Sequence, residues 1–212
     1  MKSPIENKNV LIDTKDNLSL EQQRLFKYFG VGAKIKPPIR ILNPHRIAIG
    51  DRTSIQEGCH INAFEDLAFL RSYIENDYRD DFSDEDYIYD SSIEIGKENQ
   101  LGRFLFISCT NHIVLEQNVL VSERVFIGDN NHSFSHMHVP IMQQPNQKGS
   151  QIVIQKGSWI GAGASLLRGT QIGRFCVVGS NSVCKDVFPD YAVIGPEPAR
   201  MLFRRFENSE HS

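Results

Sequence analysis

Long apolar segments are missing from this sequence of 212 residues. A membrane-spanning helix needs roughly 18 consecutive apolar residues, and no run approaches that length, so we expect no transmembrane helix. The opening residues, MKSPIENKNV, lack the apolar core of a secretory signal. Both absences favour a cytoplasmic protein.

Strong charge and paired cysteines are missing as well. The net charge is -3, which supplies no basic surface, and we expect no nucleic-acid partner. No CxxC pair occurs among the four cysteines, Cys59, Cys109, Cys176 and Cys184. In a chain without an export signal we expect them to be buried free thiols.

The sequence does contain an aliphatic residue at every sixth position, over four blocks. The blocks are Ile49, Ile55 and Ile61; Ile95, Leu101, Ile107 and Ile113; Leu115, Val121 and Ile127; and Ile154, Ile160, Leu166, Ile172 and Val178, with Cys184 in the same phase. In the last block a small residue follows each aliphatic by four positions, at Ser158, Ala164, Thr170, Cys176 and Ser182. A period of six is neither the helical period nor simple strand alternation. It fits a strand and a tight turn repeated three times per coil of about 18 residues, and stacked coils form a parallel β-helix.

Two segments interrupt this repeat, and we expect both to leave the coil as excursions. Residues 64–92 are rich in carboxylates, and residues 133–151 directly follow His132. The sequence therefore predicts an N-terminal segment over 1–40, a β-helix over 41–195 and a C-terminal cap and tail over 196–212.

Both ends of the coil are expected to be closed by short elements. The stretch SLEQQRLFKYFG (19–30) predicts a short helix that is capped by Ser19 and stopped by Gly30. Residues 198–206 predict a strand or helix over the last coil, because a solenoid must cover its open end.

Three histidines, His132, His136 and His138, fall within seven positions of the segment FIGDNNHSFSHMH. His132 closes the repeat that begins at Ile127, and His112 closes the repeat that begins at Ile107. The two lie one coil apart, allowing for a two-residue slip, so we expect their rings on one corner of adjacent coils. His136 and His138 fall outside the repeat, in the loop that follows.

The chain resembles the hexapeptide-repeat acyltransferases over about residues 40–206. Its most specific parts are SWIGAGASLLRGTQIG (158–173), KDVFPDYAVIGPEPAR (185–200) and the histidine of IGDNNH. It looks most similar to the sugar O-acetyltransferases of surface-polysaccharide assembly, relatives of the maltose and galactoside acetyltransferases. The resemblance implies an all-β, left-handed parallel β-helix with excursion loops and short terminal helical segments. It also implies a homotrimer that binds acetyl-CoA between subunits.

By resemblance, His132 is the general base of acetyl transfer. A sugar hydroxyl attacks a thioester poorly unless its proton is removed, and an imidazole that titrates near neutral pH suits this task. The candidate contacts to a carbohydrate acceptor are Asn131, His112, His136 and His138. Zinc held by His132, His136 and a ligand from a neighbouring subunit is the metal alternative. It leaves the WIGAGA and PAR segments without a purpose, so we expect no metal.

The resemblance also implies which residues bind acetyl-CoA. Trp159, Gly161 and Ala162 match the segment along the pantetheine arm, where the Ala162 amide would hold the oxyanion. Ser180 matches a further pantetheine contact one coil later. Lys185 and Arg200 match basic residues that meet the phosphate and adenine end, although the family's run before its Lys-Asp pair is one residue longer than here.

These expectations favour an O-acetyltransferase that moves the acetyl group of acetyl-CoA to a sugar hydroxyl by direct attack. Two alternatives stay open at this point. One is N-acetylation of a nucleotide-linked amino sugar, in which the acceptor nitrogen needs less help from a base. The other is a structural β-helix without catalytic activity, which would not bind CoA.

Overall fold

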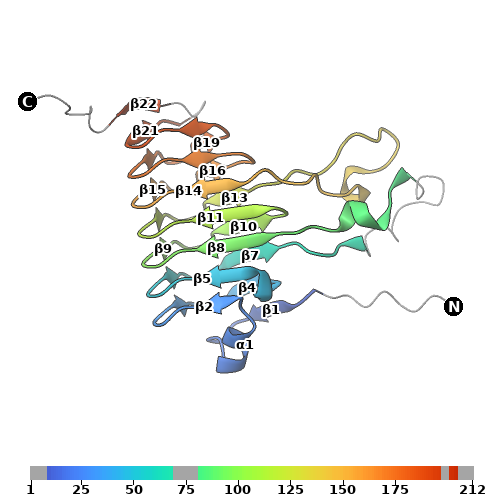
Figure 1. Cartoon of the computed structure of the whole chain (residues 1–212), viewed down its shortest axis with the longest axis horizontal. Coiled ribbons are helices and arrows are strands. Elements are labelled where there is room, and N and C mark those ends of the chain that lie inside the picture. The colour runs from blue at the N-terminus through green and yellow to red at the C-terminus, as the bar shows by residue number, and fades with distance from the viewer. Residues whose placement is uncertain (1–8, 69–80, 197–200, 205–212) are drawn as a thin grey trace, which may run out of the picture.

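The computed structural model describes residues 9–68, 81–196 and 201–204, and they form a left-handed parallel β-helix with two excursions on one side (Figure 1). Three sheets run along the stack of coils, one on each face of a triangular prism. Sheet A contains β1 (Leu11–Thr14), β4 (Ile39–Leu42), β7 (Cys59–Ala63), β10 (Phe106–Cys109), β13 (Phe126–Gly128), β16 (Ser165–Leu166) and β19 (Val183–Cys184).

The other two sheets have the same construction. Sheet B contains β2 (Tyr28–Phe29), β5 (Ile47–Ile49), β8 (Ser92–Ile95), β11 (His112–Leu115), β14 (Ile152–Ile154), β17 (Gln171–Ile172) and β20 (Val187–Phe188). Sheet C contains β3 (Lys34–Ile35), β6 (Ser54–Ile55), β9 (Gln100–Leu101), β12 (Leu120–Val121), β15 (Trp159–Ile160), β18 (Val177–Val178), β21 (Ala192–Ile194) and β22 (Met201–Arg204).

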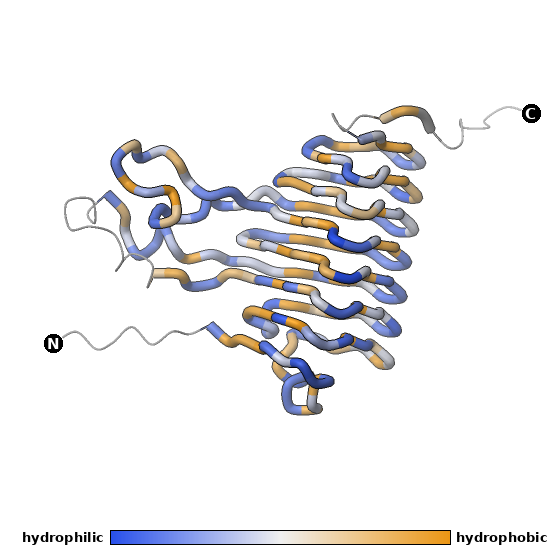
Figure 2. The backbone as a smooth tube through the Cα atoms, turned by 180° about the vertical axis from the view of Figure 1, so that it is seen from behind, coloured by the Kyte–Doolittle hydropathy of each residue, from blue (hydrophilic) through white to orange (hydrophobic). Residues whose placement is uncertain are grey.

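The six-residue repeat lies in the core, as the sequence predicts. Every aliphatic residue of the repeat points inward and is at most 2% exposed, and the small residues of the last block are buried beside them. Figure 2 shows the resulting alternation of apolar and polar stretches along each coil. The strand register places equivalent residues of the repeat beside one another: Ile61 pairs with Ile107, and Ile107 pairs with Ile127. The four cysteines are buried free thiols, which confirms that prediction.

The turns between sheets bring the backbones of successive coils very close together. A Cβ atom on Gly161 would lie 2.6 Å from the amide nitrogen of Ser180, a distance that no real side chain tolerates. Other turn positions need a left-handed backbone, and Gly163 takes φ +70° at one of them. The glycines of the repeat therefore serve the stacking of the coils.

The N-terminal helix is shorter than the sequence suggests. Helix α1 spans Leu20–Arg24, and Ser19 caps it together with Gln22 in a capping box, which confirms the predicted cap. Gly30 does not stop this helix, because β2 lies between them. A Cβ atom on Gly30 would lie 2.4 Å from the amide nitrogen of Asp51, so this glycine allows the close approach of the next coil.

Antiparallel strands lie at both ends of the stack. β1 pairs with β4 at the first coils, and β22 pairs with β21 at the last. Of the two forms expected for the C-terminal cap, the strand is the one observed over Met201–Arg204. Among the described residues, no helix has the length and apolar character needed to cross a membrane.

The two excursions leave the prism from the same corner and pack on each other. The first begins at Phe64 and returns at β8, with a short 3-10 helix, η4, at Asp84–Tyr87; the second carries η5 at Ile141–Gln143. Between them lies a second apolar cluster, built from Leu67, Ala68, Phe82, Tyr87, Tyr89 and Val139. The Tyr87 and Tyr89 hydroxyls donate to the carbonyls of Gln143 and Asn146, at 2.9 and 3.1 Å. The first excursion, which is rich in carboxylates, therefore supports the second, which carries the histidines.

Candidate active site

Two corners of the prism carry the residues that the sequence singles out. Corner I is the column of turns that follow sheet C, with Gly102, Ser122, Gly161 and Gly179 in successive coils. Corner II is the column that follows sheet A, with Thr110, Asp129, Leu167 and Lys185. Both excursions leave from corner II.

Corner I brings together most of the residues predicted to bind acetyl-CoA. Trp159 is the first residue of β15 and is 45% exposed, and its indole nitrogen donates to the Ser122 hydroxyl of the preceding coil, at 2.9 Å. Ala162 and Ser180 occupy equivalent turn positions in adjacent coils, and both are exposed. Gly161 is buried between them by coil stacking.

The Ala162 amide is free for a ligand. The neighbouring amides are engaged, since Gly161 donates to Val178 at 2.8 Å and Gly163 to Glu123 at 2.9 Å. The Ala162 carbonyl accepts from Asn181, but its own N–H makes no hydrogen bond within the described part of the chain. A free backbone donor that faces outward on a rigid turn is the kind of group that stabilises an oxyanion.

A groove of about 530 Å³ runs along corner I and reaches Ala162. Gln56, Gly102, Ser122 and Ala162, from four successive coils, line it. Four coils correspond to about 14 Å at the usual spacing of strands. A groove of that length beside a free amide fits an extended arm that ends in a thioester.

Lys185 lies on corner II and not with the other cofactor candidates. Leu166 pairs with Cys184, 18 residues later, whereas Ile172 pairs with Phe188, only 16 residues later. The missing residues shorten the turn that carries Lys185, in agreement with the shortened run noted in the sequence. Lys185 is exposed there. Arg200 lies outside the described residues.

The expectation that His132 stacks on His112 in the coil is wrong. The chain leaves the coil directly after Gly128, so His132 lies in the second excursion, and β11 pairs with β14 instead. The first part of the excursion is an antiparallel ribbon in which His132 lies opposite Asn146. Ser133 donates to Pro145 at 3.0 Å, and Gln147 donates to Asn131 at 2.8 Å. Asn131 and His132 are both exposed on this ribbon.

Asp129 holds the start of the ribbon. Where the chain leaves the coil, the amides of Thr110 and Asn111 have no strand above them to bond. The buried Asp129 carboxylate accepts from both at 2.8 Å, and also from the Thr110 hydroxyl and the side-chain amide of Asn130. Charge-assisted bonds to backbone amides are stronger than neutral ones. Sequence reasoning missed Asp129, although it is a carboxylate two positions after Ile127, a residue of the buried repeat.

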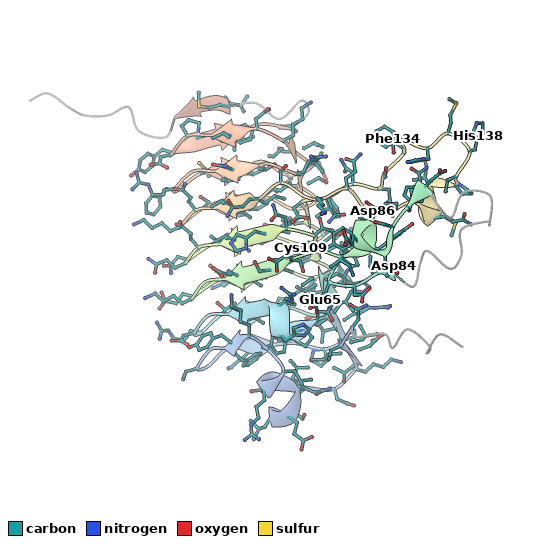
Figure 3. The ribbon with its side chains drawn as sticks, turned by 45° about the vertical axis from the view of Figure 1, so that its right-hand side comes forward. Glu65, Asp84, Asp86, Cys109, Phe134 and His138 are labelled. Carbon is teal, nitrogen blue, oxygen red and sulfur yellow. The ribbon has the colours of Figure 1, made fainter. Side chains whose placement is uncertain are left out.

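The other histidines have different surroundings. The His136 ring packs on Phe82 with centroids 4.5 Å apart, and its Nδ1 lies 3.8 Å from the Asp81 carboxylate, so it joins the two excursions. His138 is exposed, and Figure 3 shows it at the outer end of the second excursion. His112 is half-buried, and its Nδ1 shares a short hydrogen bond with the Ser92 hydroxyl. Their contact with an acceptor remains a prediction.

No metal site is present in the described part of the chain, where no three His, Cys, Asp or Glu side chains are grouped to hold an ion. The four cysteine thiols are buried, and burial keeps them in the protonated form. Burial raises the pKa of Cys59 to about 11 and that of Cys184 to about 12. Burial and the adjacent Asp129 carboxylate raise the pKa of Cys109 further, and burial also raises the pKa of Cys176.

Corners I and II of one chain are separated by the width of sheet A. Along the coil, Ala162 on corner I and Leu167 on corner II are about 16 Å of extended chain apart. The ribbon with His132 projects away from corner II, on the side shown in Figure 1. Proton transfer requires contact within about 3 Å. A single chain therefore does not bring His132 to the Ala162 amide.

Removal of the Asp129 carboxylate should destabilise the fold. In Asp129→Ala the amides of Thr110 and Asn111 lose their acceptor, and each orphaned buried group costs about 1–3 kcal/mol. Asp129→Asn keeps one acceptor oxygen and should lose about half as much. Urea unfolding measures the difference, with the exposed Asp186→Ala as control. A loss in Asp129→Ala no larger than in the control would contradict the role given to this carboxylate.

The four thiols should resist alkylation in the folded protein. With a pKa of about 11, only about one Cys59 thiol in a thousand is a thiolate at pH 8, and the thiolate is the reactive form. Iodoacetamide at pH 8 should therefore leave all four cysteines unmodified by mass spectrometry, and label them once urea unfolds the chain. Rapid labelling of one cysteine in the folded protein would show an accessible nucleophile that this structure does not contain.

Comparison with known proteins agrees with the fold and with the sequence of corner I. The family described as bacterial transferase hexapeptide (six repeats) matches residues 151–186. A probable acetyltransferase of Mycobacterium tuberculosis, Rv3034c, is 32% identical over 170 residues, which cover 78% of this chain and 54% of the relative. The putative lipopolysaccharide biosynthesis O-acetyl transferase WbbJ of Escherichia coli K12 is 32% identical over 110 residues, 49% of this chain and 56% of the relative. The chain thus spans little more than half the length of either relative.

Solved structures share the architecture over nearly the whole chain. AntD, an N-acyltransferase from Bacillus cereus in complex with dTDP and 3-hydroxybutyryl-CoA, has a TM-score of 0.68 at 17% identity, over 91% of this chain and 92% of that one. The hexapeptide-repeat acetyltransferase VCA0836 from Vibrio cholerae, complexed with acetyl coenzyme A, has a TM-score of 0.51 at 20% identity, over 90% and 81%. At these identities the likeness concerns the fold. With the repeat, the coil and the matching relatives together, the chain is similar to the hexapeptide-repeat acyltransferases.

Proposed function

We propose that this protein transfers an acetyl group from acetyl-CoA to a hydroxyl of a sugar, in the assembly of a surface polysaccharide. The observation that carries the proposal is the free Ala162 amide at the end of the corner I groove, one coil beyond the coil from which the His132 ribbon leaves. The relatives named for acetyl transfer, among them WbbJ, support the same chemistry. Cytoplasmic location remains a prediction.

The proposed site is shared between copies of the chain in a homotrimer. Because corners I and II of one chain lie apart, the ribbon of one copy has to meet corner I of the next. A ring of three 24.1 kDa chains supplies that contact three times, since a head-to-tail interface that closes repeats the same pairing. On this arrangement Lys185 of one copy faces the groove of its neighbour, where its charge would meet phosphate.

The residues then divide the reaction between them. His132 accepts the proton of the acceptor hydroxyl as the oxygen attacks the thioester carbonyl carbon. The Ala162 amide of the adjacent copy donates a hydrogen bond to the oxyanion that forms. When the carbon–sulfur bond breaks, the protonated His132 returns the proton to the leaving sulfur, so the products are an acetyl ester and free CoA. No covalent enzyme intermediate is needed, which agrees with four buried thiols.

AntD favours a second candidate, because its N-acyltransferase structures cover almost the whole chain. In that reaction the acceptor would be the amino group of a nucleotide-linked sugar. An amine is already a nucleophile once it is neutral, so loss of His132 would be mild. The effect of removing His132 therefore separates the two candidates.

For the proposed O-acetyl transfer, His132→Ala should lower kcat by about 10²–10⁴-fold. His138→Ala, on the same excursion and also exposed, should lower kcat much less, because a contact of His138 to the acceptor would appear in KM. Acetyl transfer from radiolabelled acetyl-CoA to a panel of sugars measures both. Circular dichroism confirms that each variant is folded. Comparable losses in the two variants would contradict the assignment of His132 as the base.

A further inference from the structure

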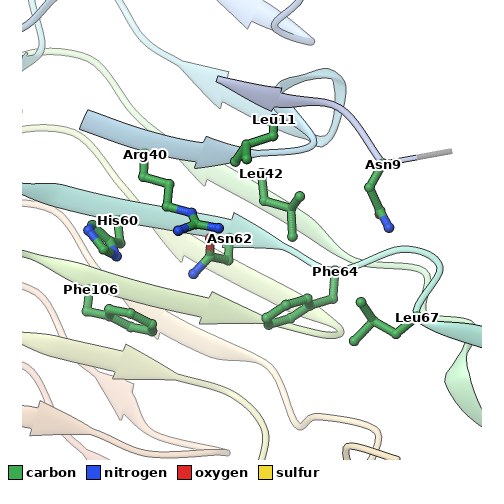
Figure 4. A pocket seen from close by; sticks show the side chains of 9 residues that line it. All are labelled: Asn9, Leu11, Arg40, Leu42, His60, Asn62, Phe64, Leu67 and Phe106. Atoms are coloured by element: carbon green, nitrogen blue, oxygen red, sulfur yellow. The ribbon is translucent and has the colours of Figure 1, made fainter. Parts of the chain in front are cut away.

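The outer face of sheet A carries a cavity of about 460 Å³ that the proposed chemistry does not use. Its floor consists of outward side chains of β4, β7 and β10, among them Arg40, His60 and Phe106 (Figure 4). Leu11 of β1 forms one wall, and Phe64 of the first excursion forms another. Solenoid faces usually carry polar residues, so a walled cavity here needs an explanation.

Three polar side chains that line this cavity have unused donors in the described chain, whereas Asn9, which also lines it, is hydrogen-bonded to Asp66 and Asn43. Arg40, His60 and Asn62 all line it, and none of the three forms a side-chain hydrogen bond or an ion pair within the described chain. Arg46 pairs with Glu65 and Arg174 with Asp190, whereas Arg24 and Arg124 have no ion pair in the described chain and do not line this cavity. A guanidinium that is left unpaired next to an imidazole and an amide is available to a ligand.

The charge of the surroundings favours an anion. No Asp or Glu lines the cavity. Asp13 lies opposite Arg40 in the register of β1 and β4, but it is outside the lining and forms no ion pair with Arg40 in the described chain. Asp13 lines a smaller adjoining cavity with Arg40 and His60, so its carboxylate offsets part of the Arg40 charge, but in the described chain no ion pair occupies the guanidinium.

Aromatic rings add to this preference. His60, Phe106 and Phe126 form a column along the axis, with centroids 5.7 and 5.9 Å apart. Phe106 stacks on Phe126 with ring planes 24° apart, and His60 is tilted by 39° to Phe106, so these partly exposed rings present electropositive edges as well as faces. Edges of this kind suit oxygen-rich ligands, and the apolar walls suit the body of a ring.

We propose that this cavity binds an anionic oxygen group, phosphate or carboxylate, of the sugar acceptor. A guanidinium holds both groups through paired hydrogen bonds. The inference rests on the proposed function and deepens it by naming the class of acceptor. The position is suitable, because β13, from which the His132 ribbon leaves, directly follows β10 in sheet A. An acceptor anchored at Arg40 extends along this face toward the ribbon.

Binding without acetyl-CoA tests the cavity by itself. Isothermal titration calorimetry would use glucose 1-phosphate, glucuronate and the uncharged methyl glucoside as probes. Arg40→Met retains the aliphatic stem and removes the charge, so it should raise the Kd of a bound anion at least ~10-fold. Arg24→Ala removes an exposed arginine on α1 and should leave that Kd unchanged. In turnover, Arg40→Met should raise KM for the acceptor and leave KM for acetyl-CoA unchanged.

The outcomes separate the possible sources of the anion. Binding of glucose 1-phosphate alone would assign a phosphorylated or nucleotide-linked acceptor, and binding of glucuronate alone would assign an acidic sugar. Equal affinity for methyl glucoside, no binding of either anion, or an Arg40→Met variant that binds as tightly as the unaltered chain would overturn the proposal. His132→Ala should bind the anions normally, so failure of the transfer reaction and failure of this cavity are distinguishable.

Discussion

The stacking of one coil on the next governs the rest of this structure. Backbone amides of each coil bond to carbonyls of the next, as Gly161 does to Val178 at 2.8 Å, while the repeated aliphatics fill the interior. Neither the ladder nor the core tolerates an insertion along a face. Extra residues can leave only at a corner, where the backbone is free to turn outward. The position of the candidate catalytic ribbon is a consequence of that constraint.

When the chain leaves at a corner, backbone amides of the preceding coil lose their hydrogen-bond acceptors. Asp129 solves this by presenting a carboxylate to the two orphaned amides. The first excursion then supports the second through an apolar cluster of its own. The same geometry keeps the ribbon and the free Ala162 amide on separate corners, and it leaves the donor-lined cavity on the sheet between them. A site that needs both corners is best built from two copies.

The sequence predicts the coil well because the information is local. Ile107 and Ile127 are inward for the same reason as their neighbours six residues away, and the Ser19 cap is visible from Gln22. The place of His132 is harder to predict, because the repeat phase continues through it while the chain has already left the coil at Asp129.

The cavity on sheet A is harder to predict than either. Arg40, His60 and Phe106 come together only when the lengths of the coils and of the first excursion are known, although residues 60, 106 and 126 show aromatic rings before a core aliphatic. The sequence shows the shortened run before Lys185, but it does not show that Lys185 lies on corner II.

A mixed oligomer shows directly whether the site is shared between copies. One partner is His132→Ala, which lacks the base, and the other is Ala162→Pro, which lacks the amide hydrogen; each alone should be inactive. If the two are unfolded together and reassembled in equal amounts, about one site in four should pair an intact His132 with an intact Ala162 amide across the interface. The shared site predicts that about a quarter of the wild-type rate returns. Mixed oligomers that form and yet remain as inactive as their parents would contradict it.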